Sequence, residues 1–353
     1  MSIPLLICDD SNMARKQVAR SLPDGWDVDI TFAADGAEGI EAIKAGKGDV
    51  LLLDLNMPVM DGYEVLEAIL KQDLPTLVIV ISGDIQPEAH QRVTSLGALD
   101  FIKKPVSKDK LTEVLQAYGI HTQDDQLELL QVNKRKELPQ DDQPLIHIAK
   151  EDTGPSLEND LRDCYQEIAN VAMGRAGDLL ARLLNVFVVL PIPNVNLIEV
   201  SELSMALSAV ERLDSTSGIC QGFIGGGISG EALLILNDSS FKDVASLMGF
   251  KGELDRNSEL ELLMDLANVL ISACLGGISE QLDLPFSQGH PVILGQHRPI
   301  SDLIAANSKK WQRTLAIEIS YNIENYDIKC DLLFLFTEKS MKTLNNKIAY
   351  LLD

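Results

Sequence analysis

The chain of 353 residues has few cysteines, few aromatic residues and few basic residues, and these shortages exclude several classes of protein. Its five cysteines stand singly, with no CxxC pair and no zinc-ligand spacing, so we expect small buried thiols in a reducing cytoplasm. Lysine and arginine number 30 against 53 acidic residues, which gives a formal net charge of −23. This surplus argues against nucleic acid and against an anionic membrane surface, because both require positively charged contact surfaces.

Long hydrophobic runs are also missing. No run reaches the roughly 18 apolar residues of a membrane span, and the first residues lack the basic start of a signal peptide, so we expect a cytoplasmic protein. The length favours two or three domains. We predict one domain at 1–118, a polar, proline-containing linker at 119–155 and a second domain at 156–353.

The first domain alternates short apolar runs with amphipathic stretches. The runs are Leu5–Cys8, Val28–Ala34, Val50–Leu55, Leu77–Ser82 and Asp100–Pro105. Apolar strands separated by helices are typical of a parallel sheet covered on both faces. The pattern therefore predicts a doubly wound α/β domain whose ligand site lies at the carboxyl ends of the strands.

The second domain repeats itself. Helical patterns run over about 157–185 and 257–282, and each precedes a strand region marked by a proline. Further on, Gly230–Phe250 resembles Lys329–Ala349 about 100 residues later. An internal duplication over about 157–250 and 257–353 predicts two related halves packed as one pseudo-symmetric domain.

Polar residues end four of the predicted strands in the first domain, and their chemistry is that of phosphoryl transfer to a carboxylate. They are Asp9, Asp10, Asp54, Ser82 and Lys104. Such a transfer needs a nucleophile, a divalent cation and a positive group beside the moving charge. Adjacent carboxylates at a strand end suit Mg²⁺, which prefers oxygen ligands.

These residues resemble the receiver (CheY-like) family over about 115 residues. The resemblance implies a five-stranded flavodoxin-like fold, Mg²⁺ as cofactor and a sensor histidine kinase as partner. By this resemblance, Asp54 would accept the phosphoryl group, Asp9 and Asp10 would be the acidic pair that binds the metal, and Asn56 would be a further metal ligand. Ser82 would contact the phosphoryl group, Phe101 would be the aromatic switch residue, and Lys104 would neutralise the charge of the phosphoryl group. With Asp54 itself, Asp9 and Asn56 complete the implied metal set, and the Lys104–Pro105 bond is expected to be cis. The alternative is a receiver that keeps the fold without accepting phosphate, but such chains usually lack one of these residues.

The second domain carries one spacing twice. The two copies read Asp163-x3-Glu167-x2-Asn170 with Pro193 after it, and Glu261-x3-Asp265-x2-Asn268 with Pro291 after it. Residues three or four apart lie on one face of a helix, so each acid and amide project together. Such a pair is poorly suited to covalent catalysis and well suited to holding a cation with one group and a water with the other.

This pattern resembles the CheC/CheX/FliY family of chemotaxis phosphatases, from Ser156 to the C-terminus. The resemblance implies an α+β domain with two long helices against a sheet, and a phosphorylated CheY-like receiver as substrate. Asn170 would position the attacking water and Glu167 would pair with the receiver's lysine, with Asn268 and Asp265 as their counterparts. Asp265 departs from the family's glutamate and reaches about 1.3 Å less far, so we expect the second copy to be weaker.

Several alternatives stay open from the sequence. The repeated acids and amides could be solvated helix residues, or the domain could keep the fold without activity, as flagellar switch proteins do. The glycines of Gly222–Gly230 favour a turn over a nucleotide loop, because a strand and not a helix follows them. For function, the sequence favours an aspartyl-phosphate phosphatase regulated through Asp54, and the alternative is a phosphorylation-gated module that docks a receiver or flagellar component without hydrolysis. The domain could also act on its own Asp54.

Overall fold

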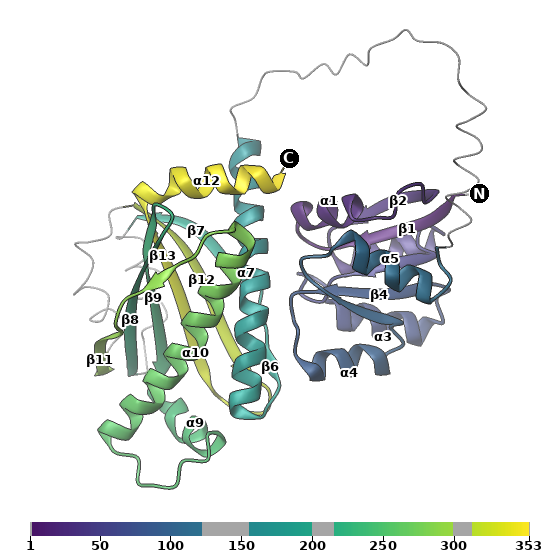
Figure 1. Cartoon of the computed structure of the whole chain (residues 1–353). Helices are drawn as coiled ribbons and strands as arrows, with labels where there is room; N and C mark the ends of the chain where they lie inside the picture. Colours follow the sequence, from purple (N-terminus) through teal and green to yellow (C-terminus); the bar gives the residue numbers. More distant parts are fainter. Residues whose placement is uncertain (1, 122–154, 200–214, 299–312, 353) are drawn as a thin grey trace. The chain divides into compact units, whose positions relative to one another are not determined.

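The structure is a computed structural model that describes residues 2–121, 155–199, 215–298 and 313–352 (Figure 1). These residues form two compact units, one built on a five-stranded sheet and one on an eight-stranded sheet. Apart from its ends, the linker predicted at 119–155 lies outside the described residues. We describe each unit by itself.

The N-terminal unit alternates strands and helices throughout. Its elements are β1 Ile3–Cys8, α1 Asn12–Arg20, β2 Val28–Ala33, α2 Gly36–Lys44, β3 Val50–Leu53, α3 Gly62–Gln72, β4 Leu77–Ser82, α4 Pro87–Ser95, β5 Asp100–Lys103 and α5 Lys108–Ala117. The strands are parallel in the order β2-β1-β3-β4-β5. The predicted doubly wound fold is confirmed, and the five apolar runs are its five strands.

Both faces of this sheet are covered, as the apolar runs require. Alternate residues of one strand enter opposite cores, so Leu6 and Leu51 pack on one face while Leu5 and Leu52 pack on the other. All four are at most 1% exposed. Since neither face is free, the carboxyl ends of the strands are the part of the sheet that can hold polar side chains.

Two glycines let the chain turn tightly beside the end of β3. A Cβ on Gly62 would lie 2.3 Å from the carbonyl oxygen of Asp54, and one on Gly36 would lie 2.6 Å from that of Met60. Asp61 then starts α3 with a capping box, in which it and Glu64 each accept a hydrogen bond from the other's backbone N–H. The loop that carries Asp54 is thus fixed on both sides.

The C-terminal unit contains two long helices and one antiparallel sheet. Its elements are α7 Pro155–Leu184, β6 Val188–Val189, β7 Asn194–Glu199, β8 Thr216–Gly225, β9 Ile228–Asn237, η1 Asp238–Ser240, α9 Phe241–Leu247, α10 Arg256–Leu282, β10 Ser287–Gln288, β11 Val292–Arg298, β12 Arg313–Ile323, β13 Lys329–Thr337 and α12 Glu338–Leu352. The sheet runs β10-β8-β9-β13-β12-β6, with β11 also on β8 and β7 also on β12. The unit is therefore helices plus an antiparallel sheet, with the long helices where the sequence predicted them.

The two halves of this unit are related by reciprocal contacts at its centre. Leu233 of β9 pairs with Leu333 of β13, 100 positions later. The Oγ of Ser340 accepts a hydrogen bond from the N–H of Ser229 at 2.8 Å, and the Oγ of Ser240 accepts one from that of Lys329 at 3.1 Å. Each partner lies 100 positions from its counterpart (229 and 329, 240 and 340), so the two contacts are the same contact made twice.

Each half also contributes strands to the other half's edge. From the first half β7 pairs with β12, and from the second half β11 pairs with β8. The β8–β9 hairpin turns through Gly226 and Gly227, which both have positive φ, as a tight two-residue turn requires. The glycine-rich segment is therefore a turn, as its sequence predicted.

Helices α7 and α10 lie side by side on one face of the sheet (Figure 1). They approach closely where a Cβ on Gly277 would lie 2.8 Å from the Cα of Ala172. Among the described residues, α10 is the one helix long and apolar enough to cross a membrane, although no unbroken apolar run predicts it. Since 61% of its most apolar window is buried inside the protein, a core role explains the same composition, and the helix is weak evidence for a membrane span.

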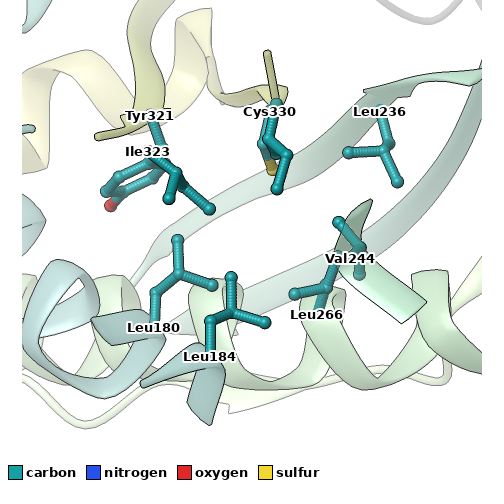
Figure 2. A pocket seen from close by; sticks show the side chains of 9 residues that line it. Leu180, Leu184, Leu236, Val244, Leu266, Tyr321, Ile323 and Cys330 are labelled. Atoms are coloured by element: carbon teal, nitrogen blue, oxygen red, sulfur yellow. The ribbon is translucent and has the colours of Figure 1, made fainter. Parts of the chain in front are cut away.

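A small cavity lies between these helices and the sheet (Figure 2). Its lining is almost wholly apolar, with Leu180, Leu184 and Leu266 from the helices, and the Tyr321 hydroxyl lies 3.4 Å from the Cys274 Sγ. Without a charged group to orient a ligand, we interpret this cavity as imperfect core packing. All five cysteines of the chain are buried and free, as predicted.

Candidate functional site

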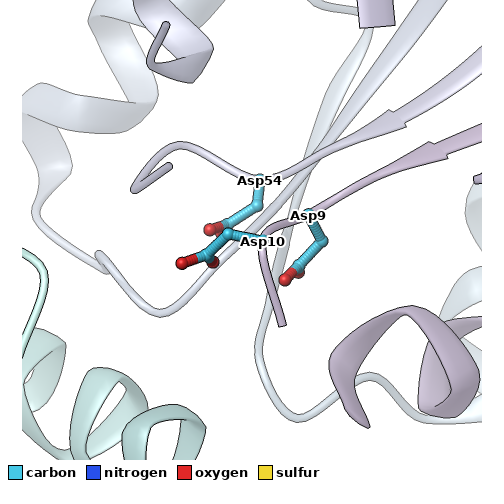
Figure 3. Close-up of side chains that lie close together, drawn as sticks. All are labelled: Asp9, Asp10 and Asp54. Carbon is cyan, nitrogen blue, oxygen red and sulfur yellow. The ribbon is translucent and has the colours of Figure 1, made fainter. Parts of the chain in front are cut away.

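Three carboxylates meet at the carboxyl ends of β1 and β3. Asp9 and Asp10 follow β1, and Asp54 follows β3, its neighbour in the sheet. One oxygen of each lies within 4.8 Å of one oxygen of the other two (Figure 3). Asp9 and Asp54 are 3% and 2% exposed, so burial holds this charge in a medium that screens it poorly.

Lys104 is the cation that faces this cluster. Its Nζ lies 2.7 Å from the Asp9 Oδ2 and 3.3 Å from the Asp54 Oδ1, and its side chain is 3% exposed. The backbone N–H of Ser11 donates to the second oxygen of Asp9 at 2.9 Å. Asp9 is thereby held by two donors, while the Oδ1 of Asp54 is buried beside the lysine and has no well-directed hydrogen bond among the described residues.

The pKa values of two of the acids reflect this crowding. Burial raises the pKa of Asp10 to about 7, and the charges of Asp9 and Asp54 add to the effect. Burial also raises the pKa of Asp54 to about 6, against the opposing effect of Lys104. One lysine therefore compensates three carboxylates only in part, and the site favours either protons or another cation.

A divalent cation fits this pocket. Three ionised carboxylates and one ammonium leave two negative charges, which one Mg²⁺ would balance, and Mg²⁺ binds carboxylate oxygens. The buried Oδ1 of Asp54 supplies an oxygen that lacks a hydrogen-bond donor. The residues that would hold the ion are Asp9, Asp10 and Asp54, with Asn56 two positions after Asp54.

The other predicted receiver residues lie at the same edge of the sheet. Ser82 ends β4 and is fully buried, and its carbonyl accepts a hydrogen bond from the N–H of Lys104 at 2.9 Å. The N–H of Asn56 donates to the Oδ2 of Asp54 at 3.2 Å. Phe101 is half-buried on β5, opposite Val80, and the Lys104–Pro105 bond is cis, as the resemblance implied.

The two predicted acid–amide pairs lie on the two long helices but differ in exposure. Glu167 and Asn170, which we call the α7 pair, are 4% and 5% exposed. Asp265 and Asn268, which we call the α10 pair, are both exposed on the surface of α10. In both pairs the acid lies about one helical turn before the amide, as the spacing predicted.

The sequence analysis missed one polar cluster in the C-terminal unit. His297 lies between two carboxylates, with its Nδ1 2.8 Å from the Asp238 Oδ2 and its Nε2 3.1 Å from the Glu259 Oε2. Ser217 donates to the other oxygen of Asp238 at 2.8 Å. These residues come from β11, η1, α10 and β8, so no local spacing in the sequence announces them.

Comparison with known proteins identifies relatives of the N-terminal unit. The family model of the response regulator receiver domain matches residues 5–116 of this chain. The chemotaxis protein CheY of Treponema pallidum is 37% identical over 112 residues, which is 31% of this chain and 77% of that protein. A protein-glutamate methylesterase/protein-glutamine glutaminase of Geobacter sulfurreducens is 40% identical over 114 residues, and the match spans only 30% of that protein's length. Among solved structures, Thermotoga maritima FliY is 15% identical with a TM-score of 0.38, and the match covers 54% of this chain and 96% of that structure.

Proposed function

This chain belongs to the response regulator receiver family, and we propose that its C-terminal unit hydrolyses the aspartyl phosphate of a phosphorylated receiver protein such as CheY. The observation that carries the proposal is the acid–amide pair that recurs 98 positions apart on α7 and α10 (Glu167 and Asp265, Asn170 and Asn268). It occurs in a chain whose receiver unit has, at one edge of its sheet, the residues that the sequence predicted for carrying an aspartyl phosphate.

In the receiver unit, Asp54 would accept the phosphoryl group from a sensor histidine kinase. Its carboxylate oxygen forms the new bond to phosphorus while the donor leaves with the electron pair of the bond that breaks. Lys104 lies where it can neutralise the transferred charge, and Ser82 ends the adjacent strand where its hydroxyl can contact a phosphoryl oxygen. Mg²⁺, when bound, would supply charge neutralisation for the phosphoryl oxygens.

In the C-terminal unit, each pair would act on a phosphorylated receiver by position and charge. An acid and an amide three residues apart are separated by about 4.5 Å along the helix axis and lie on one face. The carboxylate would pair with the lysine of the bound receiver, and the amide would hold a water in line with the phosphorus. Five buried free thiols suit the reducing cytoplasm, where kinases and receivers meet.

The test is release of inorganic phosphate from a phosphorylated single-domain receiver. The enzyme is the chain with Asp54→Asn, which cannot itself be phosphorylated at that position. We expect it to accelerate the release of phosphate from the receiver. Asn170→Ala combined with Asn268→Ala should reduce the added rate on the order of a hundredfold, because both water-holding amides are gone. If the double variant equals its parent, the pairs are not the hydrolytic site.

A second candidate is a docking module that binds receivers without hydrolysis. The shorter acid of the α10 pair favours it, because Asp265 would reach less far than a glutamate toward the lysine of a bound receiver. Under this alternative, phosphorylation at Asp54 would change binding, and a phosphorylated receiver would bind the chain with no gain in phosphate release. Measuring binding and release on the same mixture separates the two functions.

A further inference from the structure

Arg15 reaches from helix α1 back to the end of β1. It is the fourth residue of α1, and side chains on a helix point toward the N-terminus of that helix. Its Nη1 donates a hydrogen bond to the carbonyl oxygen of Asp9 at 2.5 Å and to that of Asp10 at 3.2 Å. These two carbonyls lie in the turn between the strand and the helix, where no other described backbone group pairs with them. Arg15 supplies the missing donor.

Asp10 depends on this contact more than its neighbour does. The carboxylate of Asp9 is held on both sides, by the Nζ of Lys104 at 2.7 Å and by the backbone N–H of Ser11 at 2.9 Å. Among the described residues, the only hydrogen bond of Asp10 is the one that its carbonyl accepts from Arg15. An oxygen of its carboxylate nevertheless lies within 4.8 Å of oxygens of the other two acids of the pocket. Because like charges repel at that distance, a group other than the carboxylates must keep Asp10 in place.

We propose that Arg15 is a positioning residue of the receiver pocket, which holds the turn after β1 so that the two carboxylates of that turn face Asp54 and can take up Mg²⁺ together. The inference rests on the proposed phosphoacceptor role of this pocket and adds a residue that does not lie at a strand end. A ligand that is fixed through its backbone keeps its carboxylate oxygens available to the ion. Lys104, by contrast, contacts the same oxygens that the ion would need.

The place of Arg15 in the helix supports a role outside the helix itself. A helix N-terminus carries a partial positive charge, so a basic side chain in the first turn is unfavourable for the helix. Helix α1 has no acidic residue in its first turn to offset this cost. The next residue, Lys16, carries the same charge but is exposed. A comparison of Arg15 with Lys16 therefore separates an effect of charge at this helix end from an effect of the contact with the turn.

Magnesium binding tests the assignment in the full chain. Every form carries Asn170→Ala with Asn268→Ala, so that the proposed hydrolysis does not affect the result. The forms compared are this parent, Arg15→Ala, Arg15→Lys and the matched control Lys16→Ala. Calorimetric titration of the unphosphorylated chains gives the Kd for Mg²⁺. The initial rate of phosphorylation by acetyl phosphate, measured at increasing Mg²⁺, gives the half-saturating concentration of Mg²⁺ and the limiting rate.

We expect Arg15→Ala to raise both the Kd and the half-saturating concentration on the order of tenfold, as the loss of a group that orients metal ligands does. The limiting rate should stay near that of the parent, because the acids are already in place once the ion is bound. Arg15→Lys should recover part of the affinity, since its ammonium group can donate to both carbonyls but its side chain is shorter. Lys16→Ala should match the parent in both measurements.

The same measurements can overturn the inference. An unchanged Kd in Arg15→Ala would show that Asp10 needs no such support, and equal losses in Arg15→Ala and Lys16→Ala would assign the effect to charge alone. A lower limiting rate at an unchanged half-saturating concentration would show that Arg15 does not act through the metal site. Thermal unfolding without Mg²⁺ checks that each form is folded, and if Arg15→Ala is not, equal affinity of Arg15→Lys and the parent would overturn the inference instead. A parent that neither binds Mg²⁺ nor accepts phosphate would remove the proposed role of the pocket itself.

Discussion

At Asp10 and Asp54, protons and a divalent cation compete for the same oxygens. Both pKa values are raised, from 3.8 to about 7 and to about 6, so the folded chain without an ion retains protons that the unfolded chain has released. Between about pH 4 and pH 7 the contribution of these two acids to the stability of the chain therefore falls as pH rises. A bound cation needs the ionised forms, and its charge offsets both the burial and the mutual repulsion that raise the two pKa values.

We predict that Mg²⁺ binds more tightly as pH rises toward and through 7, and that binding near pH 6 releases protons. Calorimetric titration of Mg²⁺ in buffers of different ionisation enthalpy measures that release. Asp10→Asn should reduce it, because one of the two titrating acids is gone, while Glu67→Gln, an exposed acid on α3, should leave it unchanged. Proton release that stays the same in Asp10→Asn would show that Asp10 does not titrate with the metal.

Among the elements, β11 is tied to its surroundings by a histidine. His297 has a positive φ of 54°, and its ring joins η1 to the first turn of α10 through Asp238 and Glu259. The hydrogen bond to Asp238 raises the pKa of His297, Glu259 adds to it, and Arg256 opposes it. Only the protonated ring can donate to both carboxylates at once.

This bridge predicts a pH-dependent difference in stability. Because the folded pKa of His297 is raised, its contribution is complete below the unfolded value near 6.5 and is lost as pH rises through the folded value. We expect His297→Ala to lower the free energy of unfolding by at most about 1 kcal/mol at pH 5.5, since the ring is 44% exposed. At pH 9 the loss should be smaller, and thermal unfolding at the two pH values measures both. His290→Ala, an exposed histidine before β11, is the control, and equal losses at both pH values would contradict the bridge.

The sequence predicted elements well where local pattern determines them. Buried parallel strands need unbroken apolar runs, so Leu77–Ser82 could be placed, and polar residues at strand ends such as Asp54 and Lys104 had to meet at one edge. It could not show that β7 crosses to pair with β12, or that His297 meets Asp238, because these contacts join distant segments.

For the whole molecule, the chain combines a carrier of aspartyl phosphate with a domain proposed to remove it. Two routes then compete for the phosphate on Asp54. One acts within a single chain through the linker predicted at 119–155, where tethering gives an effective concentration in the mM range. The other acts between two copies of the chain.

Concentration separates these routes. Hydrolysis within one chain gives a lifetime of the Asp54 phosphate that is the same at every concentration, whereas hydrolysis between chains shortens it in proportion to the chain present. We predict the second behaviour for the unsubstituted chain, phosphorylated with acetyl phosphate, freed of it and followed by release of inorganic phosphate during serial dilution. Asn170→Ala combined with Asn268→Ala should lengthen the lifetime and remove its dependence on concentration, while Asn257→Ala, which removes an exposed amide of α10, should change neither. A lifetime that stays short at every dilution would instead assign the reaction to a single chain.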